Sequence, residues 1–367
     1  MRIALIILVS IHGIIHLFGF LKAFNLSSFN AISQPISKQV GLLWLTAFLL
    51  FAITAILLVI RKPYWAILAC FAIVLSQFLI FLFWKDARFG SLINVIILVA
   101  IIPAFASQQF NSKISAERKA MESEITKPQL HPDSEELINS LPKPVTKWLN
   151  KSGIDGSEII REVKLTQRVS LKMKPEQTDW KQGEADQYFT TNPPAFNWKI
   201  EIPMMPGLNA HGRDKFTHGQ GQMTIKLASL IPIVNEKDNF KINQASLQRY
   251  LAEIAWFPSA ALSSYIQWEE IDENSAKATM TYMKTEGSGT FYFNEDGSFQ
   301  KFVAMRYKGV SEKSIPTEWT VRAIKSEERN GRFIPIELEA DWKIDGKDWT
   351  WLKLKIVDIE YNPKQDK

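Results

Sequence analysis

The densest group of side chains able to do chemistry is the segment HGRDKFTH, which runs from His211 to His218. Histidine and aspartate exchange protons and arginine binds anions, so His211, Arg213, Asp214 and His218 could form an acid–base or anion-binding site. On a strand, however, neighbouring side chains point to opposite faces, which separates Asp214 and His218 from the other two. No third partner stands at a spacing typical of catalysis. The alternative is a charged strand face in solvent, and we assign no catalytic residue.

A second polar group lies inside the apolar first third of the chain. His12 and His16 are four residues apart, so a helix places them on one face, and Gln77 and Asn94 lie within later apolar segments. Polar groups within lipid are costly and often functional, which favours a small site between helices for a quinone-like or metal ligand. The alternative is that these side chains bond to one another and hold the helices together. Two histidines on one helix are too few for a metal, so we predict none.

Carboxylates and catalytic motifs point away from an enzyme. Glu269, Glu270 and Asp272 could do acid–base work if their environments separated their pKa values, but they border a predicted turn, where we expect solvent. The sequence contains no Gly-rich phosphate loop, no G-x-S-x-G and no H-E-x-x-H motif. We therefore predict no cofactor, and we leave catalysis as the least favoured interpretation.

Aromatic and methionine side chains are the better indication of function. Such side chains form adaptable apolar pockets, and they also form ordinary cores, so both interpretations stay open. We predict that the following residues line one concavity and bind an apolar ligand: Trp198, Met204, Tyr250, Trp256, Phe257, Trp268, Met280 and Tyr282.

The first hundred residues contain four apolar segments, each long enough for a helix that crosses a bilayer: Ile3–Leu21, Val40–Ile60, Tyr64–Trp84 and Gly90–Ala106. The first resembles a signal peptide, but it carries two histidines and lacks a cleavage site of small residues before Lys22. Short connections predict a compact four-helix bundle in the cell (inner) membrane. The distribution of Lys and Arg between the two sides weakly favours a cytoplasmic position for the rest of the chain.

Composition excludes several classes of protein. The net charge of +5 is modest for 367 residues, and without a dense basic stripe we predict no binding of nucleic acid. The sole cysteine, Cys70, lies in an apolar segment, so no disulfide framework can form within one chain.

After Ala106 the sequence becomes polar, and its apolar residues then repeat with the period of strands. Residues 107–131 are typical of a helical linker, and 132–367 of a β-rich soluble domain that follows the transmembrane domain 1–106. We expect a long strand over Ile159–Met173 and one amphipathic helix over Gln244–Phe257. A shift of apolar parity near Ile356 and Val357 indicates a β-bulge or a strand that changes neighbours. Hairpin turns are predicted at Asp296-Gly297, Asn330-Gly331 and Asp345-Gly346.

About a dozen antiparallel strands form too large a sheet to stay flat. The predicted fold class is therefore α+β: a four-helix transmembrane bundle followed by a large, strongly bent antiparallel sheet, or half-open barrel, with the amphipathic helix packed on its concave face.

Parts of the chain resemble known protein families. HGIIHLFGF, together with SQFLIFLFWKDARFGSLINVIIL, resembles DoxX-like four-helix membrane proteins over residues 1–106. The bent sheet resembles LolA/VioE-type half-barrels, which implies a cavity for lipid or another apolar ligand. The segments LQRYLAEIAWFPSAAL and GTFYFNEDGSFQKF resemble a bacterial family of unknown function over most of residues 130–361.

These observations predict a membrane-anchored protein whose half-barrel binds a lipid-like or other apolar ligand. The expected partners are membrane lipid and an apolar small molecule. The alternative is a protein-interaction or sensing domain tethered to the membrane, without a small ligand.

Overall fold

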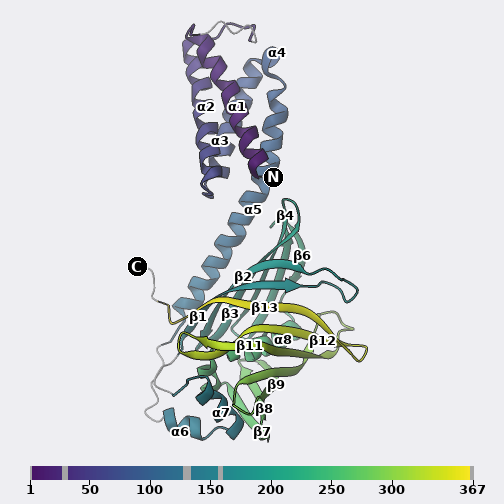
Figure 1. Ribbon diagram of the computed structural model, residues 1–367. Coiled ribbons are helices and arrows are strands. Elements are labelled where there is room, and N and C mark those ends of the chain that lie inside the picture. Colours follow the sequence, from purple (N-terminus) through teal and green to yellow (C-terminus); the bar gives the residue numbers. More distant parts are fainter. Residues whose placement is uncertain (1, 27–31, 127–133, 156–159, 364–367) are drawn as a thin grey trace. The chain divides into compact units, whose positions relative to one another are not determined.

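The computed structural model describes residues 2–26, 32–126, 134–155 and 160–363 (Figure 1). Contacts divide the chain into two compact units. The first comprises Met1–Ser112 and Ala228–Leu230, and the second comprises Lys113–Leu227 and Ile231–Lys367. The predicted boundary between linker and soluble domain, at residues 131 and 132, lies outside the described residues, so the three-part division stays a prediction.

The first unit is a bundle of apolar helices, as predicted. Its helices are α1 (Arg2–Ala23), α2 (Lys38–Val59), α3 (Trp65–Leu82), the short α4 (Trp84–Ala87) and α5 (Gly90–Ser123). Four of them, α1, α2, α3 and α5, are long and apolar enough to cross a membrane, and the protein is therefore a multi-pass membrane protein. Gly13 allows α1 to approach α2 closely, because a Cβ atom there would lie 2.8 Å from Cβ of Phe51.

The second unit is one antiparallel sheet of thirteen strands in the order β6-β5-β4-β3-β2-β1-β13-β12-β11-β10-β9-β8-β7. Two short helices precede it, α6 (Ser134–Asn139) and α7 (Lys143–Lys151). The strands of its first half are β1 (Glu162–Leu171), β2 (Lys181–Thr191), β3 (Pro194–Met205), β4 (Leu208–Thr217), β5 (Gln220–Leu227) and β6 (Ile231–Glu236). The second half has β7 (Ile266–Asp272), β8 (Ser275–Tyr282), β9 (Thr285–Phe293), β10 (Phe299–Tyr307), β11 (Pro316–Arg329), β12 (Arg332–Ile344) and β13 (Lys347–Tyr361).

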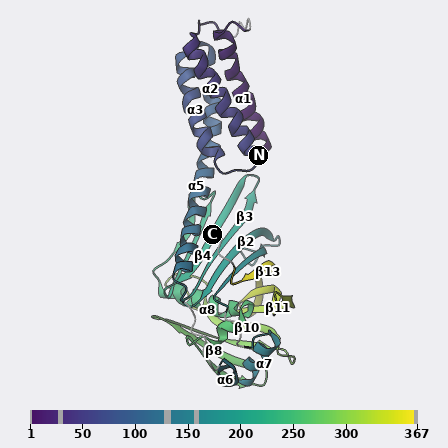
Figure 2. The same cartoon turned by 90° about the vertical axis from the view of Figure 1, so that its left-hand side faces the viewer.

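The sheet curls into the predicted half-barrel (Figures 1 and 2). Its two arms meet where Thr285 Oγ1 donates a hydrogen bond of 2.6 Å to the carbonyl oxygen of Gly219, which joins the β8–β9 turn to the β4–β5 turn. Val357 is the extra residue between the pairs Gln167–Ile356 and Thr166–Asp358, so the predicted bulge is confirmed. The predicted start of the first strand, Ile159, lies outside the described residues.

Two of the three predicted hairpin turns have the expected backbone. Both central residues of Asn330-Gly331 and of Asp345-Gly346 have positive φ, as a type I′ turn requires. At Asp296-Gly297 only the glycine does. There the Asp296 side chain accepts a hydrogen bond of 3.0 Å from the backbone N–H of Ser298, which stabilises a longer turn of a different type.

The helix on the concave face, α8 (Phe240–Glu253), starts and ends four residues earlier than predicted. The Asn239 side chain caps it by accepting a hydrogen bond from the N–H of Lys241, a signal that the apolar pattern did not reveal. The last residues predicted as helix, Ile254–Trp256, form a 3₁₀ turn, η1, and a second turn, η2, covers Pro258–Leu262. Helix α8 packs against β4 and β5 in one arm and against β8, β9 and β10 in the other.

Candidate functional site

Four charged side chains meet between α8 and the concave face of the sheet. Arg249 and Glu253 come from α8, Asp214 from β4 and Arg306 from β10. Arg249 donates hydrogen bonds of 2.6 Å to Asp214 and 2.9 Å to Glu253. Arg249 and Glu253 lie four residues apart on the helix, which places them on the same face. We call these four residues the concave ionic cluster.

Amide and indole groups complete the hydrogen bonds of this cluster. Gln187 on β2 donates a hydrogen bond of 2.8 Å to Glu253, and Gln167 on β1 donates one of 3.1 Å to Gln187. The indole N–H of Trp198 donates in turn to Gln167, at 2.9 Å, and the guanidinium of Arg249 lies 4.6 Å from the centroid of that indole ring. Both carboxylates thus have partners, as buried charges need.

Burial sets the direction of the pKa shifts in the cluster. It raises the pKa of Asp214 and of Glu253, although the nearby Arg249 acts in the opposite direction. Burial also lowers the pKa of Arg306 to about 10, and repulsion from Arg249 adds to this effect. Of the two arginines in the cluster, Arg306 is therefore the one whose charged form is less favoured by its surroundings.

Arg306 differs from Arg249 in its partners. Its Nε donates a hydrogen bond of 2.9 Å to the carbonyl oxygen of Ala245, and its guanidinium lies 4.5 Å from the ring centroid of Trp319 and 5.6 Å from that of Trp342. Within the described ranges Arg306 forms no salt bridge. The aromatic rings therefore replace the carboxylate that a half-buried arginine usually has.

Three tryptophans stand side by side on the concave face. The strand registers place Trp319 on β11 opposite Trp342 on β12, and Trp342 opposite Trp349 on β13. The ammonium of Lys308 lies 4.6 Å from the ring centroid of Trp349. We call Trp319, Trp342 and Trp349 the tryptophan row. It was not predicted from the sequence, although a two-residue turn at Asp345-Gly346 places positions 342 and 349 opposite each other.

The eight residues predicted to bind an apolar ligand lie in or against one hydrophobic core. Trp198, Tyr250, Trp256, Phe257, Met280 and Tyr282 are buried, while Met204 and Trp268 are partly exposed. Several polar tips are already bonded inside the protein. Tyr250 donates to the carbonyl oxygen of Thr190, Trp256 to that of Pro335 and Trp268 to that of Ala261, at 3.0, 3.1 and 3.0 Å. Their role in ligand binding stays a prediction.

The predicted polar cluster on β4 does not converge. Asp214 faces α8, whereas Arg213 lies 3.7 Å from Glu117 of α5, in the part of α5 that belongs to the second unit. His211 is buried near Glu201, and burial lowers its pKa. His218 lies in the β4–β5 turn, 2.9 Å from Glu124. Alternation along the strand separates these residues, as expected from the sequence, and they form no common acid–base site.

The four intramembrane polar residues do come together. Nε2 of His12 lies 2.9 Å from Oδ1 of Asn94, and Nε2 of His16 lies 2.8 Å from Oγ of Ser76. Asn94 donates to Gln77 at 3.1 Å and to Ser76 at 3.0 Å. This network joins α1, α3 and α5, and it matches the interpretation in which polar groups hold helices together. The Nδ1 atoms of both histidines have no hydrogen-bond partner in the described part of the bundle.

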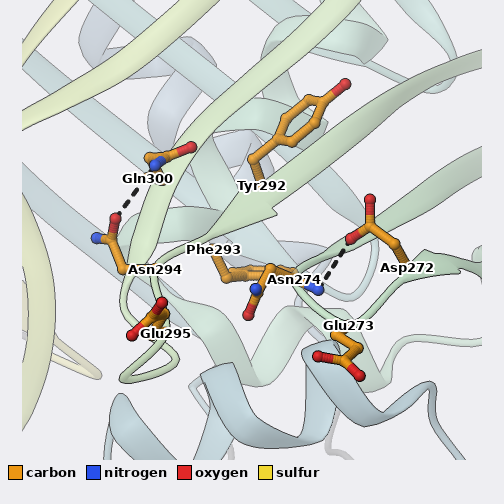
Figure 3. Close-up of a pocket in the computed structure, with 8 residues that line it drawn as sticks. All are labelled: Asp272, Glu273, Asn274, Tyr292, Phe293, Asn294, Glu295 and Gln300. Carbon is orange, nitrogen blue, oxygen red and sulfur yellow. Dashed lines mark hydrogen bonds between the residues drawn. The ribbon is translucent and has the colours of Figure 1, made fainter.

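The carboxylates near the β7–β8 turn border a surface pocket (Figure 3). The carboxyl groups of Asp272, Glu273 and Glu295 lie apart from one another there. A hydrogen bond of 2.9 Å from the backbone N–H of Asn274 lowers the pKa of Asp272, the opposite of what a carboxyl group that donates protons near neutral pH requires. Among the described residues, no group of three or more His, Cys, Asp or Glu side chains could hold a metal ion.

Comparison with known proteins gives one finding. No curated protein matches the chain. A model of a protein family matches residues 139–361, which include α7, α8 and all thirteen strands. This is more than half of the chain, and it confirms the predicted membership of a family without an assigned activity. The protein belongs to DUF6920, a family of unknown function.

Proposed function

We propose that the half-barrel binds a lipid-like or other apolar ligand beside the membrane that the four helices cross. The observation that supports this most strongly is a difference between the two ends of the sheet. In an antiparallel sheet of consecutive strands, the chain reverses direction at each connection, so every second connection lies at the same end of the sheet. At one end five of the six connections carry exposed large apolar side chains, and at the other end the turns are polar.

The apolar end comprises six connections. The β8–β9 turn there carries Met283, which is 61% exposed, and the β12–β13 turn is the polar Asp345-Gly346. Each of the other four has a large apolar side chain that is about half exposed or more. These side chains are Met173 in the β1–β2 connection, Met205 at the end of β3, Ile231 at the start of β6 and Ile315 before β11, with exposures of 48%, 60%, 61% and 72%. We call them the apolar rim. The turns at the opposite end are Asn192-Pro193, His218-Gly219, Glu273-Asn274, Asn294–Ser298 and Asn330-Gly331.

The β12–β13 hairpin, whose turn lies at the same end of the sheet, has side chains that extend from the surface into the core. Ile344, Trp349, Trp351 and Leu352 are partly exposed and pack against the core cluster. Exposed apolar surface that continues into a core is typical of a binding site for lipid or for another protein. An acyl chain is the occupant we favour, because the four apolar helices of this chain place it at a bilayer.

A photo-crosslinking experiment tests this proposal. The full-length chain is reconstituted into lipid nanodiscs that contain a phospholipid with a diazirine on its acyl chain, and the labelled peptides are identified by mass spectrometry. We expect label on the transmembrane helices and, in addition, on peptides from residues 316–352. The label on the helices is an internal standard.

Substituting two residues of the rim sharpens the test. The double variant Met205→Glu and Ile315→Glu is expected to reduce half-barrel labelling about tenfold relative to the helices, because charged side chains are costly in contact with acyl chains. Val357→Glu is the matched control, since Val357 is 46% exposed on the bulge of β13. Half-barrel labelling that is absent in the wild type, or equal in all three proteins, would refute the proposal.

A protein-interaction or sensing role without a small ligand is the second candidate. It is favoured by the burial of most of the predicted ligand residues in one packed core. Capture of a protein partner that the double rim variant no longer binds, together with absent lipid labelling, would establish it.

The orientation in the membrane is a separate prediction. We propose that the half-barrel faces the cytoplasm, since the sides alternate along four spans and the α2–α3 connection carries Arg61 and Lys62. In a Cys70→Ser background, Lys85→Cys should react with a membrane-impermeant maleimide in intact cells. Lys62→Cys should react only after the cells are permeabilised. The reverse pattern would place the half-barrel outside.

A further inference from the structure

Cations on the two faces of β10–β13 have different partners. On the convex face, Lys343 lies 3.0 Å from Glu318, Lys353 lies 2.9 Å from Glu339 and Lys355 lies 2.7 Å from Glu337. On the concave face, Arg306 and Lys308 lie over tryptophan rings, and neither forms a salt bridge in the part of the chain that the structure describes.

The guanidinium of Arg306 retains free donors. Its Nε is bonded to Ala245, but within the described residues Nη1 and Nη2 have no hydrogen-bond acceptor. The two carboxylates of the concave ionic cluster are instead bonded to Arg249. An arginine in this position presents a planar pair of donors that fits a carboxylate or a phosphate.

Unpartnered indole groups accompany this arginine. Trp319 is 4% exposed, and its Nε1 atom has no hydrogen-bond partner in the described structure. The Nε1 atoms of Trp349 and Trp351 are also buried and unpartnered among the described residues. A buried indole N–H normally has an acceptor, so three such donors indicate that acceptor atoms come from a ligand.

These observations identify the chemistry of the missing group. Arginine and indole side chains donate hydrogen bonds and offer no acceptor, so the group must supply several acceptor oxygens, and the two cations require negative charge. Lys308, whose ammonium lies 4.6 Å from the ring centroid of Trp349, adds a second positive charge on this face. The neighbouring side chains, such as Phe302 and Leu352, are apolar, which suits the chain of an amphiphile.

We propose that Arg306 and the indole N–H of Trp319, with Trp349 and Lys308 at the other end of the tryptophan row, bind the anionic head group of an amphiphile, a carboxylate or a phosphate. This inference rests on the proposed function, because it places the polar end of the same apolar ligand. The two possible sources are a free fatty acid and a phosphate-bearing lipid.

The test compares three probes that differ in their head groups. Full-length chain in nanodiscs receives a diazirine-bearing fatty acid, the corresponding alkyl phosphate or the corresponding alcohol, and labelling of residues 299–352 is measured. We expect at least one anionic probe to label about fivefold to tenfold more than the alcohol. Stronger labelling by the fatty acid than by the alkyl phosphate would identify a fatty acid as the source. Stronger labelling by the alkyl phosphate would identify a phosphate-bearing lipid. Equal labelling by these two anionic probes, with less labelling by the alcohol, would indicate a site that accepts either anion.

Variants assign the preference to the site. Arg306→Gln is expected to abolish the preference for anions, and Trp319→Phe, which keeps an aromatic ring but removes the N–H group, to reduce it several-fold. The controls are Lys343→Gln and Trp180→Phe on the convex face. The Nζ atoms of Lys172 and Lys353 lie 4.8 and 5.1 Å from the ring centroid of Trp180. Should Arg306→Gln fail to fold, as judged by its thermal unfolding, the Trp319→Phe variant still decides the matter.

The outcomes separate this inference from the proposed function. Equal labelling by the alcohol and both anions would overturn the head-group site and leave the apolar-ligand proposal standing. Unchanged anion preference in Trp319→Phe and Arg306→Gln would also overturn it. Absence of labelling by all three probes would overturn both proposals.

Discussion

Replacing Arg249 with methionine is expected to destabilise the half-barrel by about 3–5 kcal/mol, because it leaves two buried carboxylates without their counter-charge. The side chains of Asp214 and Glu253 are 13% and 11% exposed, and each accepts a hydrogen bond from this guanidinium. The measurement is the free energy of unfolding of the full-length chain in detergent, from urea titrations followed by near-UV circular dichroism.

A matched variant distinguishes lost charge balance from lost packing. Combining Arg249→Met with Asp214→Asn and Glu253→Gln removes the charges of these three residues, leaves Arg306 in place, and is expected to recover most of the lost stability. Lys343→Met, which breaks an exposed pair with Glu318, should change the free energy of unfolding by less than about 1 kcal/mol. A loss below about 1 kcal/mol in Arg249→Met itself would contradict the burial of this group.

The pH dependence of the same variant follows from the pKa shifts. Burial raises the pKa of both Asp214 and Glu253, so the folded protein binds protons there more readily than the unfolded chain does. Their contribution to stability is complete below the ordinary values of 3.8 and 4.5 and is lost as the pH rises through the folded values. Because Arg249 lowers both pKa values, its removal raises them further. The stability gap between Arg249→Met and the wild type should therefore be larger at pH 8 than at pH 4.

Replacing Trp148 with alanine is expected to cost about 3–5 kcal/mol, because it empties a large, well-packed site. Trp148 is 1% exposed and attaches α7 to the sheet. Its ring centroid lies 5.5 Å from that of Phe293, 5.6 Å from that of Phe291 and 6.3 Å from that of Trp268. The same urea titration gives the value.

Two control variants accompany this prediction. Trp148→Phe keeps an aromatic ring in the site and should cost clearly less than the alanine variant. Trp180→Ala removes a partly exposed ring on the convex face and should have a small effect. Equal effects of Trp148→Ala and Trp180→Ala would show that α7 does not depend on this contact.

Periodicity predicted the elements because each repeat reflects one local geometry. The apolar segments are long enough to form membrane-spanning helices on their own, and the alternation around Ile334, Ile336 and Leu338 requires a strand with one face in a core. The bulge at Val357 was visible for the same reason, because one extra residue shifts the parity of every side chain after it.

The start of α8 could not be predicted from periodicity. Its first turn has an exposed apolar residue, Phe240, and a buried charged one, Lys241, the reverse of the expected pattern. The helix begins there because Asn239 satisfies a free N–H group. The end of the helix was misplaced because Ile254 and Trp256 continue the apolar face while the backbone tightens into a 3₁₀ turn.

Segment length and local periodicity were enough to predict a multi-pass membrane protein with a large bent antiparallel sheet, since both features depend on neighbours in the chain. Which polar residues meet depends instead on contacts between distant segments. Asp214 on β4, Arg306 on β10 and Arg249 on α8 are far apart in the chain, and it is the curl of the sheet around α8 that brings them together. His211 and His218 lie close together in the sequence but not in one site, because strand alternation and a turn separate their side chains.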